Sequence, residues 1–194
     1  MSNAQNITAG KPKVGGAIFR APLGTTLPTS ASDTLDSAFK QMGYVTEDGV
    51  TNSNSPSSEN IKAWGGDIVL TSQTEKPDTF QFSLMEAMNA EVLKAVYGDS
   101  NVSVDENTGE ITVHANSTQQ PNCAWVIDQV LRDNGAKRIV IPDAGVSAVG
   151  DVVYKDGAAI VYPTTISAMP DGSGNTHHEY IKPVISSSIL PIGG

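Results

Sequence analysis

The 194-residue sequence has little of what marks disulfide-bonded, secreted or membrane-spanning proteins. Its single cysteine, Cys123, excludes an intrachain disulfide framework. No apolar run approaches the roughly 18 residues of a membrane helix. The first residues, "MSNAQNITAGKPKVGG", hold no hydrophobic stretch of signal-peptide type. We therefore expect a protein that is made and folds in a cytoplasm.

Basic residues are also scarce. The chain has 12 Lys and Arg residues against 21 Asp and Glu residues, which gives a net charge of -9. Proteins that bind nucleic acid by neutralising phosphates carry the opposite balance. The composition therefore argues against a nucleic-acid-binding protein, although it permits a surface that DNA passes without adhering.

Catalytic and cofactor-binding motifs are missing as well. Ser147 has no G-x-S-x-G context, and Cys123 lies in the apolar run "CAWVIDQV", which favours a small buried side chain over a nucleophile. His177 and His178 are adjacent on an expected strand and so point to opposite faces, which disfavours a shared metal. The run "DENTG" at Asp105 is better explained by a turn than by a calcium loop. We expect no enzyme, cofactor or metal.

The residues that are abundant favour β structure. Short β-branched or alternating runs are separated by Gly, Pro, Asn and Asp, and the length suits one domain, residues 1–194. The turn signals in the second half predict an antiparallel meander. The expected strands are residues 16–22, 67–73, 79–86, 101–105, 110–115, 123–133, 136–144, 146–156, 158–169 and 177–184.

The clearest alternation predicts a strand with one buried face. Phe80, Phe82 and Leu84 share one side of residues 79–86, and Gln81 and Ser83 share the other. One side should therefore pack in the core and the other should face water.

Two segments predict short helices. Asn89 is a plausible N-cap for a helix that ends at Gly98, and Asp33 is a plausible N-cap for one that ends at Gly43. Both carry an apolar stripe at helical spacing. The stripe residues are Val92, Leu93 and Val96 in the first helix, and Leu35, Ala38, Phe39 and Met42 in the second.

Three polar segments lack an independent core: an N-terminal arm (residues 1–15), a long loop (residues 46–66) and a C-terminal arm (residues 185–194). The loop nevertheless contains Ile61 and Trp64. Large apolar side chains in so polar a segment predict contact with something outside it.

Three stretches of the chain together resemble the major tail tube protein of long non-contractile-tailed (siphovirus-type) bacteriophages. They are residues 10–29, 35–98 and 149–181, which cover nearly the whole sequence. The most specific is the middle one, with the successive motifs "GYVTEDGV", "IKAWGGD" and "NAEVLKAVYG". In residues 99–145 the resemblance is mainly in the strand pattern.

The resemblance implies an antiparallel β-sandwich with one or two short flanking helices, a long hairpin loop and extended terminal arms. It implies that six copies join into a ring and that rings stack into a hollow tube, through which the genome leaves the capsid. One sheet of each subunit would line the lumen, where an acidic wall would repel DNA. It further implies a virion protein that is made in the bacterial host cytoplasm, with tail terminator, tape measure and distal tail proteins as partners.

Within that resemblance, the loop would reach neighbouring subunits and carry the contact with the next ring, and Ile61 and Trp64 would anchor it. Trp64 could instead cover the open end of its own sandwich. Gln81 and Ser83 are candidates for the lumen face. The expected contact residues of the loop are Val50, Asn52, Asn54, Pro56, Glu59, Ile61, Lys62 and Trp64.

Two other functions compete with the tube subunit. A tail terminator or tube-completing protein could share the fold and end the polymer. A carbohydrate-binding or adhesin β-sandwich would present aromatic platforms, which suits a chain with 6% aromatic residues poorly.

Overall fold

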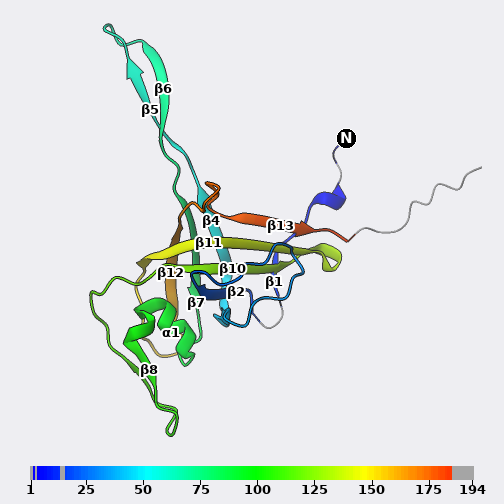
Figure 1. Cartoon of the computed structure of the whole chain (residues 1–194), viewed down its shortest axis with the longest axis vertical. Helices are drawn as coiled ribbons and strands as arrows, with labels where there is room; N and C mark the ends of the chain where they lie inside the picture. Colours follow the sequence, from blue (N-terminus) through cyan, green and yellow to red (C-terminus); the bar gives the residue numbers. More distant parts are fainter. Residues whose placement is uncertain (1, 3, 14–15, 185–194) are drawn as a thin grey trace, which may run out of the picture.

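The computed structural model describes residues 2, 4–13 and 16–184, and it is mainly β (Figure 1). Strands make up 45% and helices 9%. The predicted C-terminal arm, residues 185–194, lies outside the described residues. Of the predicted N-terminal arm, residues 2 and 4–13 are described and are exposed where their side chains are placed. This arm carries a 3-10 turn, η1 (Ala4–Asn6), and the short strand β1 (Lys11–Pro12).

Nine strands form one antiparallel sheet in the order β3-β2-β10-β11-β12-β7-β4, with β1 beside β10 and β13 beside β11. Two further pairs, β5-β6 and β8-β9, stand apart from it. The bounds are β2 (Ile18–Pro22), β3 (Lys40–Gln41), β4 (Val45–Asn54), β5 (Ser57–Lys62), β6 (Ile68–Glu75), β7 (Asp78–Leu84), β8 (Val102–Val104), β9 (Ile111–Val113), β10 (Cys123–Val130), β11 (Ala136–Val149), β12 (Tyr162–Ala168) and β13 (His178–Lys182).

The long strand β11 bends this sheet into two layers. Its first part, residues 136–140, lies between β10 and β13, whereas residues 144–149 pair with β12. The register shifts between Val146 and Ala148, and such irregularities turn a strand. One layer therefore contains β2, β10 and β13, and the other contains β12, β7 and β4. We call the second one the β4-β7-β12 layer.

Large apolar side chains from both layers fill the space between them. The ring centroids of Phe82 in β7 and Trp125 in β10 lie 5.8 Å apart. Phe80, Leu84 and Ile141 are also fully buried in this cluster. The structure confirms the predicted antiparallel sandwich and the inward face of residues 79–86.

The helix α1 (Ala90–Tyr97) confirms the first predicted helix. The Asn89 side chain caps it by accepting a hydrogen bond from the Glu91 amide at 3.0 Å, and Gly98 follows it with a φ of 99°. Val92 and Val96 are buried against the end of the core. A short 3-10 turn, η2 (Asp99–Asn101), then leads into β8.

The second predicted helix, residues 33–43, is wrong: this segment consists of turns and β3. Its apolar residues serve two different clusters. Phe39 packs on the outer face of the β2-β10 layer, whereas Met42 is buried between the layers. One face of a helix could not reach both, and so short a helix has little stability of its own. Asp33 accepts hydrogen bonds from Thr29 and Ser30, which precede it, and thus caps a turn.

Two predicted boundaries also change. The strands expected at residues 136–144 and 146–156 are one strand, β11, and residues 150–156 follow it as a loop. The predicted meander holds for β10, β11 and β12, but β13 pairs with β11 and not with β12. A 3-10 turn, η3 (Arg132–Asn134), links β10 to β11.

Candidate assembly surfaces

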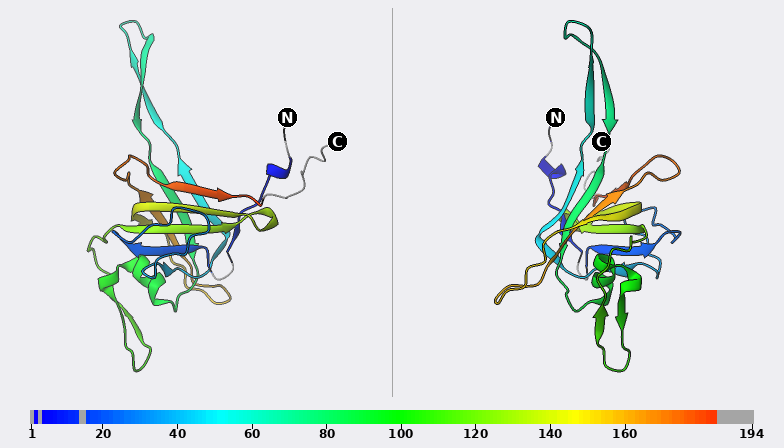
Figure 2. Two further views of the ribbon diagram at one scale, coloured as in Figure 1. Left: turned by 45° about the vertical axis from the view of Figure 1, so that its right-hand side comes forward. Right: turned by 90° about the vertical axis from the view of Figure 1, so that its left-hand side faces the viewer.

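Residues 46–66 are not a loop but the first side and the tip of a long β-hairpin. β4 pairs with β7 inside the sandwich, and β5 and β6 continue beyond it as a two-stranded ribbon. We call residues 57–75 the outer arm. It projects from one end of the sandwich (Figure 2). At its tip, the Ala63 amide donates to the Asp67 carbonyl at 2.8 Å. Backbone hydrogen bonds to β6 order this polar segment. Its composition alone does not indicate this pairing.

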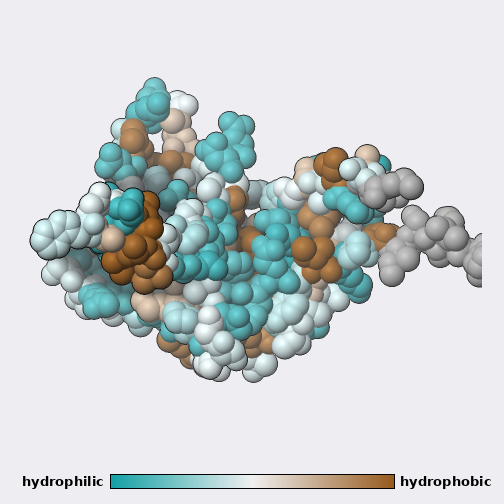
Figure 3. Space-filling view, turned by 90° about the horizontal axis from the view of Figure 1, so that it is seen from above, coloured by the Kyte–Doolittle hydropathy of each residue, from teal (hydrophilic) through white to brown (hydrophobic). Residues whose placement is uncertain are grey.

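The outer arm carries apolar side chains that nothing in the described chain covers. Every residue of β5 and β6 is exposed. The exposed fraction is 107% for Trp64, which excludes the alternative that it covers its own sandwich. Figure 3 looks down onto this end and shows hydrophobic side chains gathered where the arm projects. The other exposed apolar residues of the arm are Ile61, Ile68, Val69 and Leu70.

The structure divides the predicted loop residues into two groups. Val50, Asn52 and Asn54 belong to β4 and pair with Phe82, Phe80 and Asp78 of the sandwich. Pro56 lies between β4 and β5. Glu59, Ile61, Lys62 and Trp64 lie on the outer arm.

A buried carboxylate holds the base of the arm. Asp78 is 2% exposed and accepts hydrogen bonds from Thr176 Oγ1 at 2.6 Å and Asn52 Nδ2 at 2.7 Å, and it contacts His177 Nδ1 at 2.6 Å. The His177 ring meets Phe80 edge-on at 5.3 Å. Burial opposes ionisation of Asp78, but the hydrogen bonds from Thr176, Asn52 and His177 outweigh it and lower its pKa. The cluster ties the hairpin to the segment before β13.

Replacing this carboxylate with an amide is expected to destabilise the sandwich by about 2 kcal/mol at pH 7, since hydrogen bonds to a charged group are lost. The pKa of Asp78 is lower in the folded chain than its ordinary value of 3.8. The stabilisation that ionised Asp78 gives the fold is therefore fully present above pH 3.8, and it is lost as the pH falls through the pKa of Asp78 in the folded chain. Thermal unfolding of Asp78→Asn and the parent chain should differ at pH 7 and converge in acid. Asp48→Asn, at an exposed position of β4, is the control. Equal stability of Asp78→Asn and the parent chain at pH 7 would contradict a stabilising role of the Asp78 carboxylate.

The outward faces of β7 and β12 are formed mostly by hydroxyl and amide side chains. Gln81 and Ser83 point away from the core, as predicted, and they pair with Thr165 and Pro163 of β12. Thr79 and Ser167 extend the same face. No outward position of β7 or β12 carries a charge, and these two strands lie wholly within the described residues.

Glu91 and Lys94 of α1 line a groove. The helix lies on the side of the sandwich away from the outer arm (Figure 1). The groove encloses about 620 Å³. Arg20 forms two hydrogen bonds to the Asp99 carboxylate, at 2.9 and 2.8 Å, along one side. Cys123 is buried beneath, as predicted, and burial raises the pKa of its thiol, an effect that neighbouring Arg20 only partly offsets. The remaining lining residues are Ala21, Pro22, Leu23, Ala38, Lys40, Glu91, Lys94, Pro121 and Asn122.

A family model described as phage tail tube protein matches residues 1–187. The chain belongs to this family. A comparison with curated proteins finds no match. Phage tail tube proteins are structural components of the virion that assemble into a tube with other tail proteins, and the resemblance found in the sequence is thereby confirmed at the level of the family. No described helix is long and apolar enough to cross a membrane.

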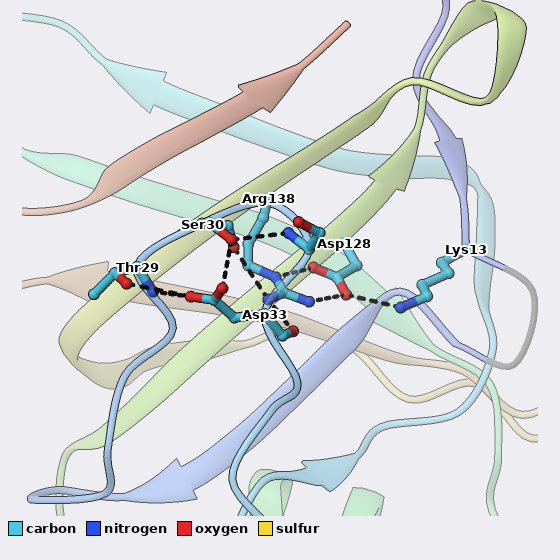
Figure 4. Close-up of polar contacts among 7 residues, drawn as sticks. Lys13, Thr29, Ser30, Asp33, Asp128 and Arg138 are labelled. Atoms are coloured by element: carbon cyan, nitrogen blue, oxygen red, sulfur yellow. Dashed lines mark hydrogen bonds and ion pairs between the residues drawn. The ribbon is translucent and has the colours of Figure 1, made fainter. Parts of the chain in front are cut away.

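In this tail tube protein, a buried ion pair fixes the segment that leads to the groove. Arg138 Nε and Nη2 donate to the two Asp128 carboxylate oxygens, at 2.6 and 2.8 Å (Figure 4). Arg138 Nη1 donates to the main-chain oxygens of Ser30 and Asp33, at 3.2 and 2.8 Å. Lys13 lies 3.5 Å from Asp128. The long turn between β2 and β3 is therefore held on the outer sheet face.

The residues that position these surfaces were not found from the sequence. Arg20 and Asp99 are 79 residues apart, and Asp78 and Thr176 are 98 apart, so no local motif links them. His177 and His178 bind different carboxylates, those of Asp78 and Asp171. The turn expected at Asp105 is confirmed, because its carboxylate accepts from the Asn107 and Thr108 amides.

Proposed function

We propose that six copies of this tail tube protein close into a ring and that rings stack into the hollow tube of a siphovirus-type non-contractile tail. The observation that carries the proposal is the outer arm, which presents Trp64 and Ile61 to solvent beyond the sandwich. An arm that buries nothing of its own chain suits a contact with another subunit. The arm residues Glu59 and Lys62 would lie at the rim of that contact.

Sheet edges support ring closure. β4 pairs only with β7, and residues 145–149 of β11 pair only with β12, among the described residues. Each β4-β7-β12 layer thus offers one free strand edge on either side. Strand addition between neighbours would convert these edges into a continuous barrel. With residues 144–149 of β11 counted as the fourth strand of each layer, six layers at about 4.8 Å strand spacing and a tilt near 40° give a barrel roughly 48 Å across.

The outward face of this layer would line the lumen, with Gln81 and Ser83 in its uncharged part, which β7 and β12 form. Hydroxyl and amide groups give DNA phosphates no cation to bind. Acidic character would come from Glu47 and Asp48, which are exposed in the irregular part of β4. Such a wall lets the genome pass during ejection without adhering. The tape measure protein would occupy the same lumen before ejection, and tail terminator and distal tail proteins would bind the tube ends.

Electron microscopy of the purified protein tests the assembly directly. Long hollow tubes of uniform width are the expected result. Single rings that do not stack at high concentration would contradict the proposal and favour a tail terminator or tube-completing protein.

Lysine placed on the outward face tests the lumen. Gln81→Lys and Thr165→Lys change paired, outward residues and should leave the tube intact. Together they would add about twelve cations per ring, so duplex DNA should remain bound to tubes at low salt and be released at high salt. Co-sedimentation of DNA with tubes measures this. Thr108→Lys, in the turn between β8 and β9, is the control that should retain no DNA. Loss of tubes in the Gln81 variant would instead place this face in a subunit interface.

A further inference from the structure

We propose that the groove beside α1 receives the tip of the outer arm of a subunit in the next ring, with Trp64 inserted between Leu23 and Pro121. The inference rests on the proposed tube and specifies how its rings would be joined. It commits the groove to one occupant, a second copy of this chain.

The positions of the two surfaces fit such a contact. The outer arm projects from one end of the sandwich, and α1, which lines the groove, lies at the opposite end (Figures 1 and 2). A projection at one end and a recess at the other form a head-to-tail interface. Because such an interface uses different patches on the two partners, it leaves one free arm and one free groove at each step and extends without limit.

The chemistry of the groove also fits Trp64. Ala21, Leu23 and Ala38 give it an apolar floor. Lys40 and Lys94 lie among its lining residues, and an indole face attracts such cations. A volume of about 620 Å³ accommodates one indole together with a neighbouring side chain of the arm.

Charges at the tip and in the groove are complementary. Asp67 is exposed and lies three residues after Trp64. Lys94 is already paired with Glu91 at 2.8 Å, but Lys40 has no carboxylate within ion-pair distance among the described residues and donates only to the Ser37 carbonyl. An arriving Asp67 carboxylate would give Lys40 a partner. Arg20, on one side of the groove, is already paired with Asp99 at 2.8 Å.

Substitution at Leu23 tests the groove without touching the arm. Leu23 is 49% exposed, so Leu23→Glu should fold, and circular dichroism checks that it does. It places a carboxylate where Trp64 and Asp67 would arrive. The critical concentration for tube formation should rise at least about 30-fold, the ratio that corresponds to losing an interface hot spot. Leu23→Met keeps an apolar side chain of similar volume and should form tubes as the parent does.

A disulfide between the tip and the groove tests the contact itself. Because Cys123 lines the groove, the variants are made in a Cys123→Ala background. Tubes of the double variant Ala63→Cys and Lys40→Cys are oxidised and run on a non-reducing gel. Because each subunit would donate one tip and receive another, we expect a ladder extending beyond dimers. Each single variant, made in the same Cys123→Ala background, has one cysteine and should remain monomeric on the gel.

The outcomes separate the two proposals. If the parent chain forms no tubes, the proposed function fails and this inference fails with it. Tubes that form normally with Leu23→Glu, or tubes of the double variant that give no ladder, overturn this inference alone. In the Cys123→Ala background, dimers of Ala63→Cys by itself would show arm-to-arm contact and would overturn it as well.

Discussion

Replacing residues 55–77 with Asn-Gly is expected to abolish tubes and to leave the sandwich folded. Asn54 and Asp78 face each other in register, so a two-residue turn can join them directly. The removed residues bury no side chain in the described chain, and the free energy of unfolding should change by no more than about 1 kcal/mol. Electron microscopy and thermal unfolding of the same sample measure both effects.

Two comparisons sharpen this experiment. Ser72→Ala changes a small exposed residue of the arm and should leave tubes unchanged. Trp64→Ala keeps the arm but removes its largest apolar side chain, and should reproduce most of the loss. Tubes of normal length from the chain without residues 55–77 would show that the arm does not join the rings.

Arg138→Ala is expected to cost about 3–5 kcal/mol of folding stability, the largest loss from any single substitution considered for this chain. Arg138 is 2% and Asp128 4% exposed, so the variant leaves a buried carboxylate without its main partner. It also frees the turn that contains Ser30 and Asp33. For a chain of this length the melting temperature should fall by roughly 6–20 °C.

The neighbouring residue provides a matched control. Lys137 forms a more exposed ion pair with Glu179 at 2.8 Å, and such pairs contribute about 1 kcal/mol or less. Lys137→Ala should therefore shift the melting temperature only slightly. If both variants melt alike, the buried pair does not stabilise the fold in the way its geometry indicates.

The sequence predicts those parts of the fold whose local pattern and tertiary environment agree. Phe80, Phe82 and Leu84 alternate with polar residues because only one face of β7 is buried, against the opposite layer. Asn89 caps α1 in the sequence context that favours a cap. Residues 33–43 have apolar residues at helical spacing but form no helix. Phe39 and Met42 pack in two separate clusters, which one helix face could not reach together.

The assembly surfaces are less accessible to sequence reasoning. Polarity correctly indicates that residues 57–66 are exposed, and Trp64 lies outside the core of its own chain. Its contact with another subunit stays a prediction. Composition could not reveal the pairing of β5 with β6, since register depends on backbone hydrogen bonds between segments. The groove could not be expected at all, because the strand β2, the helix α1 and residues 121–123 meet only in the folded chain.

The continuity of β11 has a mechanical consequence in the proposed tube. The lumen wall and the outer layer of each subunit share this strand, so the two layers are joined covalently as well as by side-chain packing. A force on the inner wall, such as drag from a moving genome, would have to bend a continuous hydrogen-bonded strand before the layers could slide. The main chain of β11 would then carry the shear, and the wall would resist it even where side-chain packing between the two layers is loose.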